Sequence, residues 1–334
     1  MSDGHDRRSF FRELFRGAQR AAGELASFRD SLADHGEQAW GPGLAGYSET
    51  TQRPVPALPV WRLASAEDLR DICRQVDREG WADAAAALAR PSIRLTPDVD
   101  GLSWLGGSPR VPAYFEWPTW DGLELVFLGQ LRLADLPSTA LPDTGSLLLF
   151  FALDRTPRGL KAADDGACRV LHVTEEPVEE LLRGHALPEM AVSASVELTL
   201  PDDPEPLIEL DGWALDEWAG LRERLAAAQG TELEERATEY HALHRLLGYP
   251  DTYAGGMELD AQLVANGIDL DDEPYTHPRI DELSPGAAGW RLLLQLSSDD
   301  ELGVELDYLE RLFVWIRDED LRAGRFDRVR AFVR

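Results

Sequence analysis

The chain has 334 residues, 44% hydrophobic and 28% charged, a composition typical of a globular protein that argues against an intrinsically disordered one. Its 61 acidic residues against 33 basic residues leave a net charge of -28, which would repel a phosphate backbone and so excludes nucleic acid as an expected partner. Such an excess keeps a protein soluble and can steer it toward a basic protein or a cationic ligand.

The number of cysteines and the length of the apolar runs indicate the cellular compartment in which the protein is expected. Cys73 and Cys168 are the only cysteines, too few for a disulfide framework or a cysteine-built zinc site. No apolar run approaches the roughly 18 residues that a membrane-spanning helix needs. We therefore expect a cytoplasmic protein with no integral membrane segment and no cofactor.

Residues 1–40 are predicted to form a basic amphipathic helical extension. Residues 7–20 contain five arginines against one glutamate, and the arginines recur at intervals of four. One interpretation is that this helix packs on the acidic body or on a second copy of the chain. The alternative is peripheral membrane contact or partner binding through residues 7–34.

A linker and a helical lead-in follow this extension. Residues 41–60 are rich in Gly, Pro, Ser and Thr, as linkers are. Helical periodicity returns in residues 61–91, where Ser65 is the expected N-cap of a helix that stops at Gly80. A second short helix is expected to end at Pro91.

Residues 103–118, SWLGGSPRVPAYFEWP, combine two glycines, three prolines and four aromatic residues. Glycine permits positive φ angles and proline fixes φ, so the stretch is predicted to be a preset irregular loop whose aromatic side chains lie on a neighbouring sheet. Arg110, Tyr114 and Trp117 are its candidate binding residues, because arginine and aromatic side chains anchor many protein interfaces.

Nearly continuous apolar runs predict strands that are covered on both faces. They occur at 123–133, 146–153, 168–173 and 193–200, and again in the last fifty residues as WRLLLQL, RLFVWIR and FDRVRAFV. Residues 213–247 are predicted to form two helices hinged at Gly230. Because strands and helices occur in blocks, we predict an α+β fold with mixed, largely antiparallel sheets and flanking helices.

Two glutamines indicate an internal duplication of strand pairs. Gln130 and Gln295 end the matching runs VFLGQL and LLLQL, and each is followed 20 positions later by an aromatic residue, Phe150 or Trp315. Each glutamine is interpreted either as a tie for the neighbouring proline-rich loop or as a ligand contact.

The order of these motifs resembles the YwqG-like family, a bacterial family classed as a domain of unknown function. The resemblance is carried by SWLGGSPRVP, FLGQLRLADLP, LPDTGSLLLFF, HRLLGYP, WRLLLQL and FVWIRDEDLRAGRFDRV, and covers residues 92–333. It implies one α+β domain over residues 92–334. The chain departs from the family where it has ELDYLE at 305–310 and Tyr253 after GYP. The resemblance implies no settled activity, although the genomic settings of some relatives imply a protein-neutralising, immunity-like role.

No common catalytic or metal-binding motif occurs in the chain. His241 and His244 stand three apart on a predicted helix, a spacing that places two imidazoles on one face but supplies no third zinc ligand. The acidic stretch 269–275 lacks the ligand rhythm of a calcium loop. No metal site and no catalytic residue is therefore predicted.

Two functions remain open at the level of sequence. The first is a non-enzymatic binding or adaptor protein with a protein partner, which would use the aromatic loop at 103–120. The second is a hydrolase-like enzyme with a cleft between the two halves of the α+β domain, lined by Gln130, His244 and Gln295. An exposed aromatic patch favours the first function and a closed polar pocket favours the second.

Overall fold

The computed structural model describes residues 65–75, 79–137, 140–175, 177–181, 183, 186–202, 217–222, 243–251, 256–271, 276–306 and 310–334. The chain divides into two units, Met1–Leu58 and Pro59–Arg334, and every described residue belongs to the second. The helical extension predicted for residues 1–40 and almost all of the linker predicted for 41–60 belong to the first unit and lie outside the described residues.

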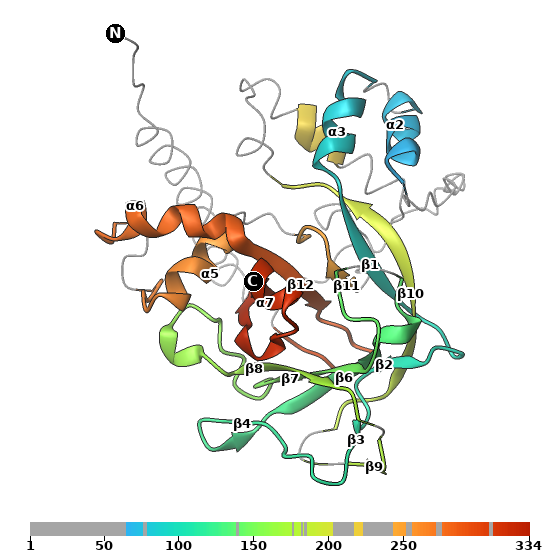
Figure 1. Cartoon of the computed structure of the whole chain (residues 1–334), viewed down its shortest axis with the longest axis vertical. Coiled ribbons are helices and arrows are strands. Elements are labelled where there is room, and N and C mark those ends of the chain that lie inside the picture. The colour runs from blue at the N-terminus through green and yellow to red at the C-terminus, as the bar shows by residue number, and fades with distance from the viewer. Residues whose placement is uncertain are drawn as a thin grey trace, which may run out of the picture. The chain divides into compact units, whose positions relative to one another are not determined.

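One ten-stranded sheet organises the second unit (Figure 1). Its strand order is β14-β13-β12-β11-β1-β10-β2-β6-β7-β8, and all neighbouring strands run antiparallel. The bounds are Arg90–Pro97 for β1, Ser103–Leu105 for β2, Val126–Arg132 for β6, Ser146–Phe151 for β7, Cys168–Val173 for β8, Met190–Thr199 for β10, His244–Leu247 for β11, Trp290–Ser297 for β12, Arg311–Arg317 for β13 and Arg330–Val333 for β14.

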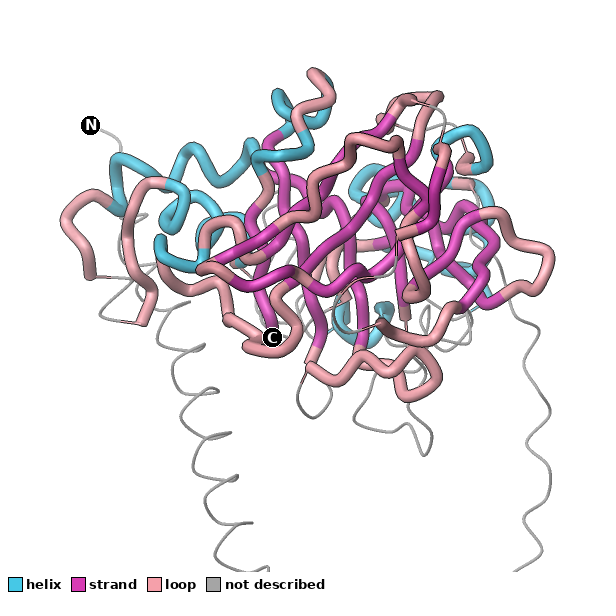
Figure 2. The backbone as a smooth tube through the Cα atoms, turned by 90° about the horizontal axis from the view of Figure 1, so that it is seen from below, coloured by secondary structure: helices cyan, strands magenta, loops and turns pink. Residues whose placement is uncertain are grey.

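Two small ribbons and several short helices surround the sheet (Figure 2). The ribbons pair β3 with β9 and β4 with β5; their bounds are Arg110–Val111, Glu179–Glu180, Thr119–Trp120 and Leu123–Glu124. The α-helices are α2 at Ala66–Gln75, α3 at Ala82–Leu88, α5 at Met257–Ala265, α6 at Ile280–Leu283 and α7 at Asp318–Arg322. The 3-10 turns are η1 at Glu79–Trp81, η2 at Leu133–Asp135, η3 at Ala162–Asp164, η5 at Ser284–Gly289 and η6 at Phe326–Arg328.

Helix α2 begins where the sequence predicts. The backbone N–H of Asp68 donates to Ser65 Oγ at 3.1 Å, and the N–H of Ser65 donates to Asp68 Oδ2 at 2.9 Å. This reciprocal capping satisfies two N–H groups that a helix start leaves without intrahelical partners. Leu69 and Cys73 then bury the apolar face of the helix against α3 and Trp218.

The two sides of the sheet repeat one another. Gln130 lies opposite Leu148 in the β6–β7 pair, and Gln295 lies opposite Phe313 in the β12–β13 pair. The two glutamines are 165 positions apart in the sequence, and their partners Leu148 and Phe313 are separated by the same 165 positions. Each pair carries a register shift at the same place, between Phe127 and Gly129 or between Leu292 and Leu294. Since register and bulge both coincide, the pairing agrees with the duplication of strand pairs predicted from the sequence.

The repeat extends to the strands next to these pairs. Trp104 of β2 lies opposite Gln130, and Arg245 of β11 lies opposite Gln295. Both strands run into a left-handed turn, with φ of 64° and 66° at residues 106 and 107 and of 60° and 76° at residues 247 and 248. We call β2, β6, β7 and β8 the first half of the sheet and β11 to β14 the second half; β1 and β10 lie between them.

The hydrophobic core draws on both halves. Ile93, Leu105, Leu131, Leu246 and Leu296 are buried in one cluster on one face of the sheet. A second cluster covers the other face of the first half, beneath the segment that follows β2. Alternation along β7 places Leu147 in the first cluster and Leu148 in the second, because successive side chains of a strand point to opposite faces.

The sheet curls until it nearly closes on itself. The N–H of Val333, on edge strand β14, donates to Arg158 O at 3.3 Å, and Arg330 pairs with Asp165 at 2.7 Å. The His172 ring of edge strand β8 lies 5.7 Å from that of Phe326. The segment after β7 and the η6 turn thus cover edges that would otherwise expose unpaired backbone groups.

The structure confirms a large, mostly antiparallel sheet with a few helices and corrects three local predictions. Residues 103–105 are a central strand, not part of an irregular loop. Residues 244–247 are strand β11, not the end of a helix; of the two helices predicted over 213–247, only residues 217–222 are described as helical. Strand β1 was not predicted. Within the described residues, no helix combines the length and apolar character needed to cross a bilayer.

Candidate functional site

The turn after β2 brings the backbone against a neighbouring segment. Gly106 N donates to Leu128 O at 2.9 Å, and Gly107 N donates to Leu187 O at 3.0 Å. A Cβ on Gly106 would lie 1.9 Å from Pro188 O, and the φ of 64° is in the region that only glycine adopts readily. Glycine is therefore required here by both conformation and space.

Gln130 holds the segment that follows this turn. Its Oε1 accepts a hydrogen bond from the backbone N–H of Arg110 at 2.8 Å. The Arg110 guanidinium lies over the Trp104 ring, 4.6 Å from its centroid, and Trp104 Nε1 donates to Ser108 O at 3.3 Å. Of the two interpretations of Gln130, the structure supports the tie for the proline-rich segment.

The aromatic residues of the segment divide into anchors and a surface group. Phe115 and Trp117 pack on Phe150, with ring centroids 6.1 and 5.2 Å away, and Trp117 Nε1 donates to Leu125 O at 2.9 Å. Tyr114 is 71% exposed. Of the three predicted binding residues here, Arg110 and Tyr114 reach the surface, whereas Trp117 is half-buried and anchors the segment to the sheet.

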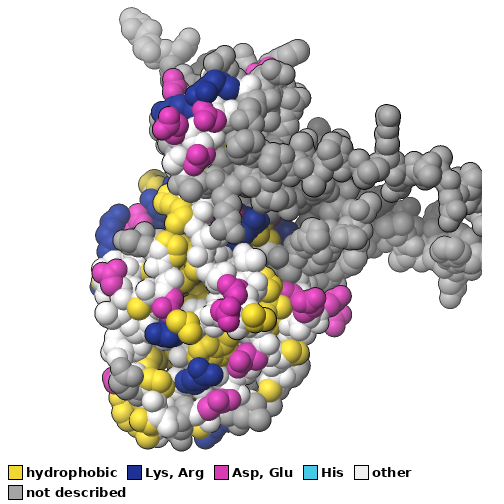
Figure 3. All heavy atoms as spheres, turned by 90° about the vertical axis from the view of Figure 1, so that its right-hand side faces the viewer, with side chains coloured by type: hydrophobic (Ala, Val, Ile, Leu, Met, Phe, Trp, Pro, Cys, Tyr) yellow, Lys and Arg dark blue, Asp and Glu magenta, His cyan; other side chains and the backbone are white. Residues whose placement is uncertain are grey.

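Tyr114 belongs to a surface made by two segments. The β3–β9 ribbon pairs Val111 with Glu179, and Val178 N donates to Val111 O at 3.0 Å. Val178 is 68% exposed, and Leu123 of β5 is 44% exposed. We call Arg110, Tyr114, Leu123 and Val178 the aromatic surface; its ribbons β3, β4 and β9 gather at one end of the sheet in Figure 1. Figure 3 shows a face on which hydrophobic side chains reach the surface among charged ones.

Charged side chains surround this surface, and acidic ones are in excess. Arg155 pairs with Asp121 at 2.7 Å, and Arg183 pairs with Glu124 at 3.4 Å. Partial desolvation and a hydrogen bond to Glu175 raise the pKa of Tyr114. The pKa of Glu175 is lowered by its own backbone N–H and by the Tyr114 hydroxyl. The hydroxyl of Tyr114 is thus a neutral donor that holds its ring beside a carboxylate.

The second half of the sheet ties its own turn in the same way. Gln295 Oε1 accepts from the N–H of Asp251 at 2.8 Å, and Gln295 Nε2 donates to Leu243 O at 3.3 Å. The paired strand residues, Trp104 and Arg245, are 141 positions apart in the sequence, and so are the tied residues, Arg110 and Asp251. Arg110 and Asp251 therefore occupy equivalent positions after β2 and β11. Gln295 is fully buried and is tied to protein groups, as Gln130 is.

His244 is buried on β11 with both ring nitrogens engaged. Nδ1 accepts from the N–H of Ser297 at 3.3 Å, so Nε2 carries the proton that it shares with Asp299 Oδ2 at 3.0 Å. His241 lies outside the described residues. Within the part of the chain that is described, no group of three or more His, Cys, Asp or Glu side chains is placed to hold a metal ion.

Ser297, His244 and Asp299 are adjacent but do not form a catalytic triad. Ser297 Oγ donates to Leu243 O at 2.9 Å and accepts from Arg311 Nε at 3.1 Å, whereas His244 receives only the backbone N–H of Ser297. A triad needs the hydroxyl itself bonded to the imidazole. Asp299 Oδ1 also accepts from the N–H groups of Glu301 and Leu302, so this carboxylate organises a turn.

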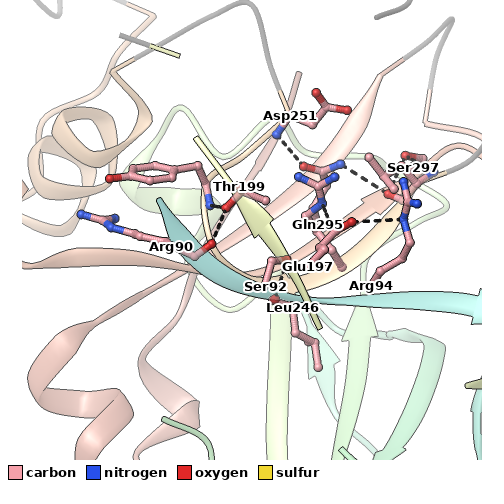
Figure 4. A network of polar contacts seen from close by, with 12 residues as sticks. Arg90, Ser92, Arg94, Glu197, Thr199, Leu246, Asp251, Gln295 and Ser297 are labelled. Carbon is pink, nitrogen blue, oxygen red and sulfur yellow. Dashed lines mark hydrogen bonds and ion pairs between the residues drawn. The ribbon is translucent and has the colours of Figure 1, made fainter. Parts of the chain in front are cut away.

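A buried network of arginines and carboxylates crosses the sheet beside Gln295 (Figure 4). Glu197 of β10 lies between two arginines: its Oε2 is 3.3 Å from Arg94 Nε and its Oε1 is 3.3 Å from Arg245 Nε. Arg311 Nη1 donates to Asp251 O at 3.0 Å, and its Nη2 lies 3.8 Å from Asp251 Oδ2. None of these charged residues was singled out from the sequence, because arginines and carboxylates on separate strands give no local signal.

A titratable pair lies next to this network. The Arg90 guanidinium is over the Tyr249 ring, 4.2 Å from its centroid, and the N–H of Tyr249 donates to Thr199 Oγ1 at 2.8 Å. Burial raises the pKa of Tyr249 and also that of Glu258, although the charges of Arg90 and Arg291 oppose both shifts. Perturbed groups of this kind occur in functional sites and also in structural ion networks.

The structure does not bring the predicted cleft residues together. Gln130 is on β6 and Gln295 on β12, and strands β2, β10, β1 and β11 separate them in the sheet. His244 neighbours Gln295 only through the β11–β12 pairing, and its ring bonds to Asp299. Each of the three side chains is bonded to protein groups of its own: Gln130 to the N–H of Arg110, Gln295 to the N–H of Asp251 and to Leu243 O, and His244 to Asp299 and to the N–H of Ser297.

Comparison with known proteins adds a family but no activity. A comparison with the curated proteins finds no match. Residues 103–333 match the family DUF1963, which is described as a domain of unknown function. The match begins at β2 and ends in β14, so it contains both halves of the sheet and leaves out β1. The chain therefore belongs to DUF1963, a family defined by a domain of unknown function.

Proposed function

We propose that this chain is a non-enzymatic binding protein that recognises another protein through the aromatic surface. The observation that carries the proposal is the position of Tyr114: it is 71% exposed, while its neighbours Phe115 and Trp117 are packed on Phe150. A large aromatic side chain held outward by a fixed backbone is a typical anchor of a protein interface.

The fixed backbone lowers the entropy that binding would remove. Gln130, the stacking of Arg110 on Trp104 and the hydrogen bond of Trp117 to Leu125 O hold the segment at three points. Glycines at positive φ and prolines restrict it further. Because less ordering remains to be done on association, such a surface binds more favourably than a flexible loop.

The charge around the aromatic surface favours a partner with a basic and partly apolar face. Among the side chains that the structure describes, five carboxylates and three arginines stand in or beside its segments, and two of the arginines are already paired with Asp121 and Glu124. The carboxylates are Glu116, Asp121, Glu124, Glu175 and Glu180, and the arginines are Arg110, Arg155 and Arg183. The chain as a whole carries a net charge of -28, which speeds encounter with a basic protein. A partner of this kind fits the protein-neutralising role that the YwqG-like resemblance implies.

The test is a two-step binding experiment with the full chain. Partners are first recovered from a lysate of the native host with the wild type and with the double variant Arg110→Ala, Tyr114→Ala; Val99→Ala is the control, since Val99 is 95% exposed on the β1–β2 connection. The affinity of each purified partner is then measured at low and high salt. We expect about a tenfold or greater loss for the double variant, a normal affinity for the control and weaker binding at high salt.

Two results would refute the proposal. One is equal affinity of wild type and double variant for every partner recovered. The other is a large fall in the melting temperature of the double variant together with unchanged recovery, because the segment would then serve the fold alone.

A further inference from the structure

The connection between β7 and β8 lies against β14 at the seam where the sheet nearly closes. We call residues 157–166 the seam segment. The N–H of Val333 donates to Arg158 O at 3.3 Å, and Gly159 lies so close to Ala331 O that a Cβ there would overlap it. The seam segment thus covers the backbone of an edge strand that would otherwise be open to pairing.

Ion pairs fasten the seam segment to the rest of the molecule. Three of its charged side chains pair with residues outside it: Arg158 with Glu310 at 2.8 Å, Lys161 with Asp271 at 2.9 Å and Asp165 with Arg330 at 2.7 Å. The side chains that the segment itself supplies are at least half exposed in all three pairs. Exposed ion pairs contribute little individually and are weakened by salt, because mobile ions screen the charges. This fastening should therefore depend on ionic strength.

Apolar packing adds little to this fastening. Two of the ten residues in the seam segment are buried, and both are glycines, whereas Leu160 is half-buried. The backbone is held by the hydrogen bond from Leu270 N to Leu160 O, at 2.7 Å, and by that from Ala162 N to Asp269 Oδ1, at 3.0 Å. Segments that bury few apolar side chains are the ones that open locally, without unfolding of the whole domain.

Left-handed backbone angles occur at both ends of the seam segment. Gly166 has a φ of 84°, which glycine adopts readily, and Thr156, directly before the segment, has a φ of 40°. A positive φ is an outlier for a β-branched residue, and such strain persists only where the surrounding contacts maintain it. Movement of the segment would release the strain at Thr156 and would be tolerated at Gly166.

A small cavity lies behind the seam segment. Its wall is formed by the segment itself, by residues 329–331 and by the buried side chains of Phe151, Cys168 and Val264. The cavity holds about 10 Å³, enough for one group of the size of a water molecule. A larger molecule therefore has no room beside the Cys168 thiol while the seam segment stays in place.

We propose that the seam segment is a salt-sensitive latch, which pivots at Thr156 and Gly166 without unfolding of the sheet and gives small solutes access to the cavity behind it. Opening breaks the three ion pairs and uncovers the edge of β14, but it exposes no large apolar side chain of the segment. The latch is separate from the aromatic surface and does not depend on the proposed protein partner.

The two cysteines report separately on the latch and on general unfolding. Cys168 lines the cavity, whereas Cys73 is buried in another cluster, on α2. The full chain is treated with iodoacetamide at pH 8, and the slow modification of each cysteine is followed over hours by mass spectrometry of its peptide. Because a buried thiol reacts only after local opening, its rate measures how often the open form occurs.

Salt should act on the two cysteines differently. From about 0.02 M to about 1 M sodium chloride, we expect the modification rate of Cys168 in the wild type to rise about fivefold or more, since the ion pairs of the seam segment are screened. The rate of Cys73 should change less than about twofold, because the ion pairs of the seam segment do not cover it.

Lys161→Met combined with Asp165→Asn is the decisive variant, because it removes two of the three ion pairs and leaves the net charge unchanged. Arg132→Met combined with Asp135→Asn is the matched control: it removes an ion pair of 3.2 Å between β6 and η2 and also leaves the net charge unchanged. Loss of one exposed pair shifts an equilibrium about two- to fivefold. At low salt the first variant should therefore react at Cys168 about fivefold faster than the wild type, and the control at the wild-type rate.

The proposal is overturned if Cys168 and Cys73 react at a common rate under every condition, because the sheet would then open only by general unfolding. It is equally overturned if salt leaves the Cys168 rate of the wild type unchanged, or if the control variant raises that rate as much as the decisive variant does. Should the decisive variant fail to fold, the salt dependence of the wild type decides alone.

Discussion

Ser103 and His244 accept equivalent hydrogen bonds in the two halves of the sheet. The N–H of Arg132 donates to Ser103 Oγ at 3.0 Å, and the N–H of Ser297 donates to His244 Nδ1 at 3.3 Å. Residues 132 and 297 are equivalent in the β6 and β12 registers. Both halves of the sheet thus have a side-chain acceptor at the start of β2 or β11, the hydroxyl of Ser103 in one and the imidazole of His244 in the other. Only the imidazole also hydrogen-bonds to a carboxylate, that of Asp299.

Asp299 is predicted to make stability depend on acid pH. Burial would raise its pKa, but hydrogen bonds from His244 and from the N–H groups of Leu302 and Glu301 outweigh burial and lower it. A carboxyl whose pKa is lower in the folded state stabilises that state above its unfolded value of about 3.9, and the contribution is lost as pH falls through the folded value. Asp299→Asn should therefore cost about 1–3 kcal/mol at pH 7 and less near pH 2.

Urea unfolding between pH 2 and pH 7 measures this difference. Asp98→Asn is the control, because Asp98 also accepts a backbone N–H in a turn, at 3.1 Å from Asp100 N, but is exposed. A loss of stability in Asp299→Asn that is the same at every pH would contradict the account.

The two glutamines should contribute unequally to stability. Replacing either by methionine keeps its volume and removes its hydrogen bonds. Gln130→Met leaves the N–H of Arg110 without its acceptor. Gln295→Met leaves the N–H of Asp251 without its acceptor and also removes one of the two hydrogen bonds that Leu243 O accepts, the other coming from Ser297 Oγ. Each variant leaves one N–H unpaired, at about 1–3 kcal/mol, and Gln295→Met loses one further hydrogen bond worth about 1 kcal/mol, so it should be the more destabilising variant in urea unfolding. A larger loss of stability in Gln130→Met than in Gln295→Met would contradict this account.

Gly106→Ala should be far more harmful than Gly122→Ala. Both glycines have positive φ, 64° and 75°, which costs alanine about 1–2 kcal/mol. A Cβ at Gly106 would also lie 1.9 Å from Pro188 O, whereas a Cβ at Gly122 meets nothing within 4 Å. Melting temperatures of the two variants separate the cost of the backbone angle from that of the close contact. Equal shifts would mean that residues 187–188 move aside freely.

Both cysteines should be unreactive in the folded protein. Burial raises the pKa of Cys168 to about 12 and also raises that of Cys73. Since the thiolate is the reactive form, a thiol reagent at pH 8 should modify neither cysteine in the native protein and both after unfolding in urea. Rapid modification of Cys168 in the native protein would show that the strand β8 edge opens in solution, and rapid modification of Cys73 would show that helix α2 does.

Removal of residues 1–34 should leave a folded and cooperative protein. The GPGLAGYSETTQRP stretch at 41–54 has the composition of a linker, and the family match begins only at residue 103. We expect the truncated chain to keep a single sharp melting transition and to lose association instead. A broad or absent transition would place the predicted helix in the core.

Local patterns in the sequence were sufficient for the features that depend on neighbouring residues. The capping of α2 by Ser65 and Asp68 follows from side chains that reach only their own turn. The matched runs around Gln130 and Gln295 predicted equivalent strand pairs, because a common register places the same residue types at the same steps along two strands.

Only the tertiary structure decided how distant segments combine. HRLLGYP has the apolar spacing of a helix end, but pairing with β1 and β12 makes residues 244–247 a strand, since tertiary contacts override weak local preference. Trp117 and Tyr114 look alike in the sequence, yet one packs on Phe150 and the other faces solvent. Likewise Arg94, Glu197 and Arg245 come together from β1, β10 and β11, because strand order and not sequence distance determines which charges share a buried face.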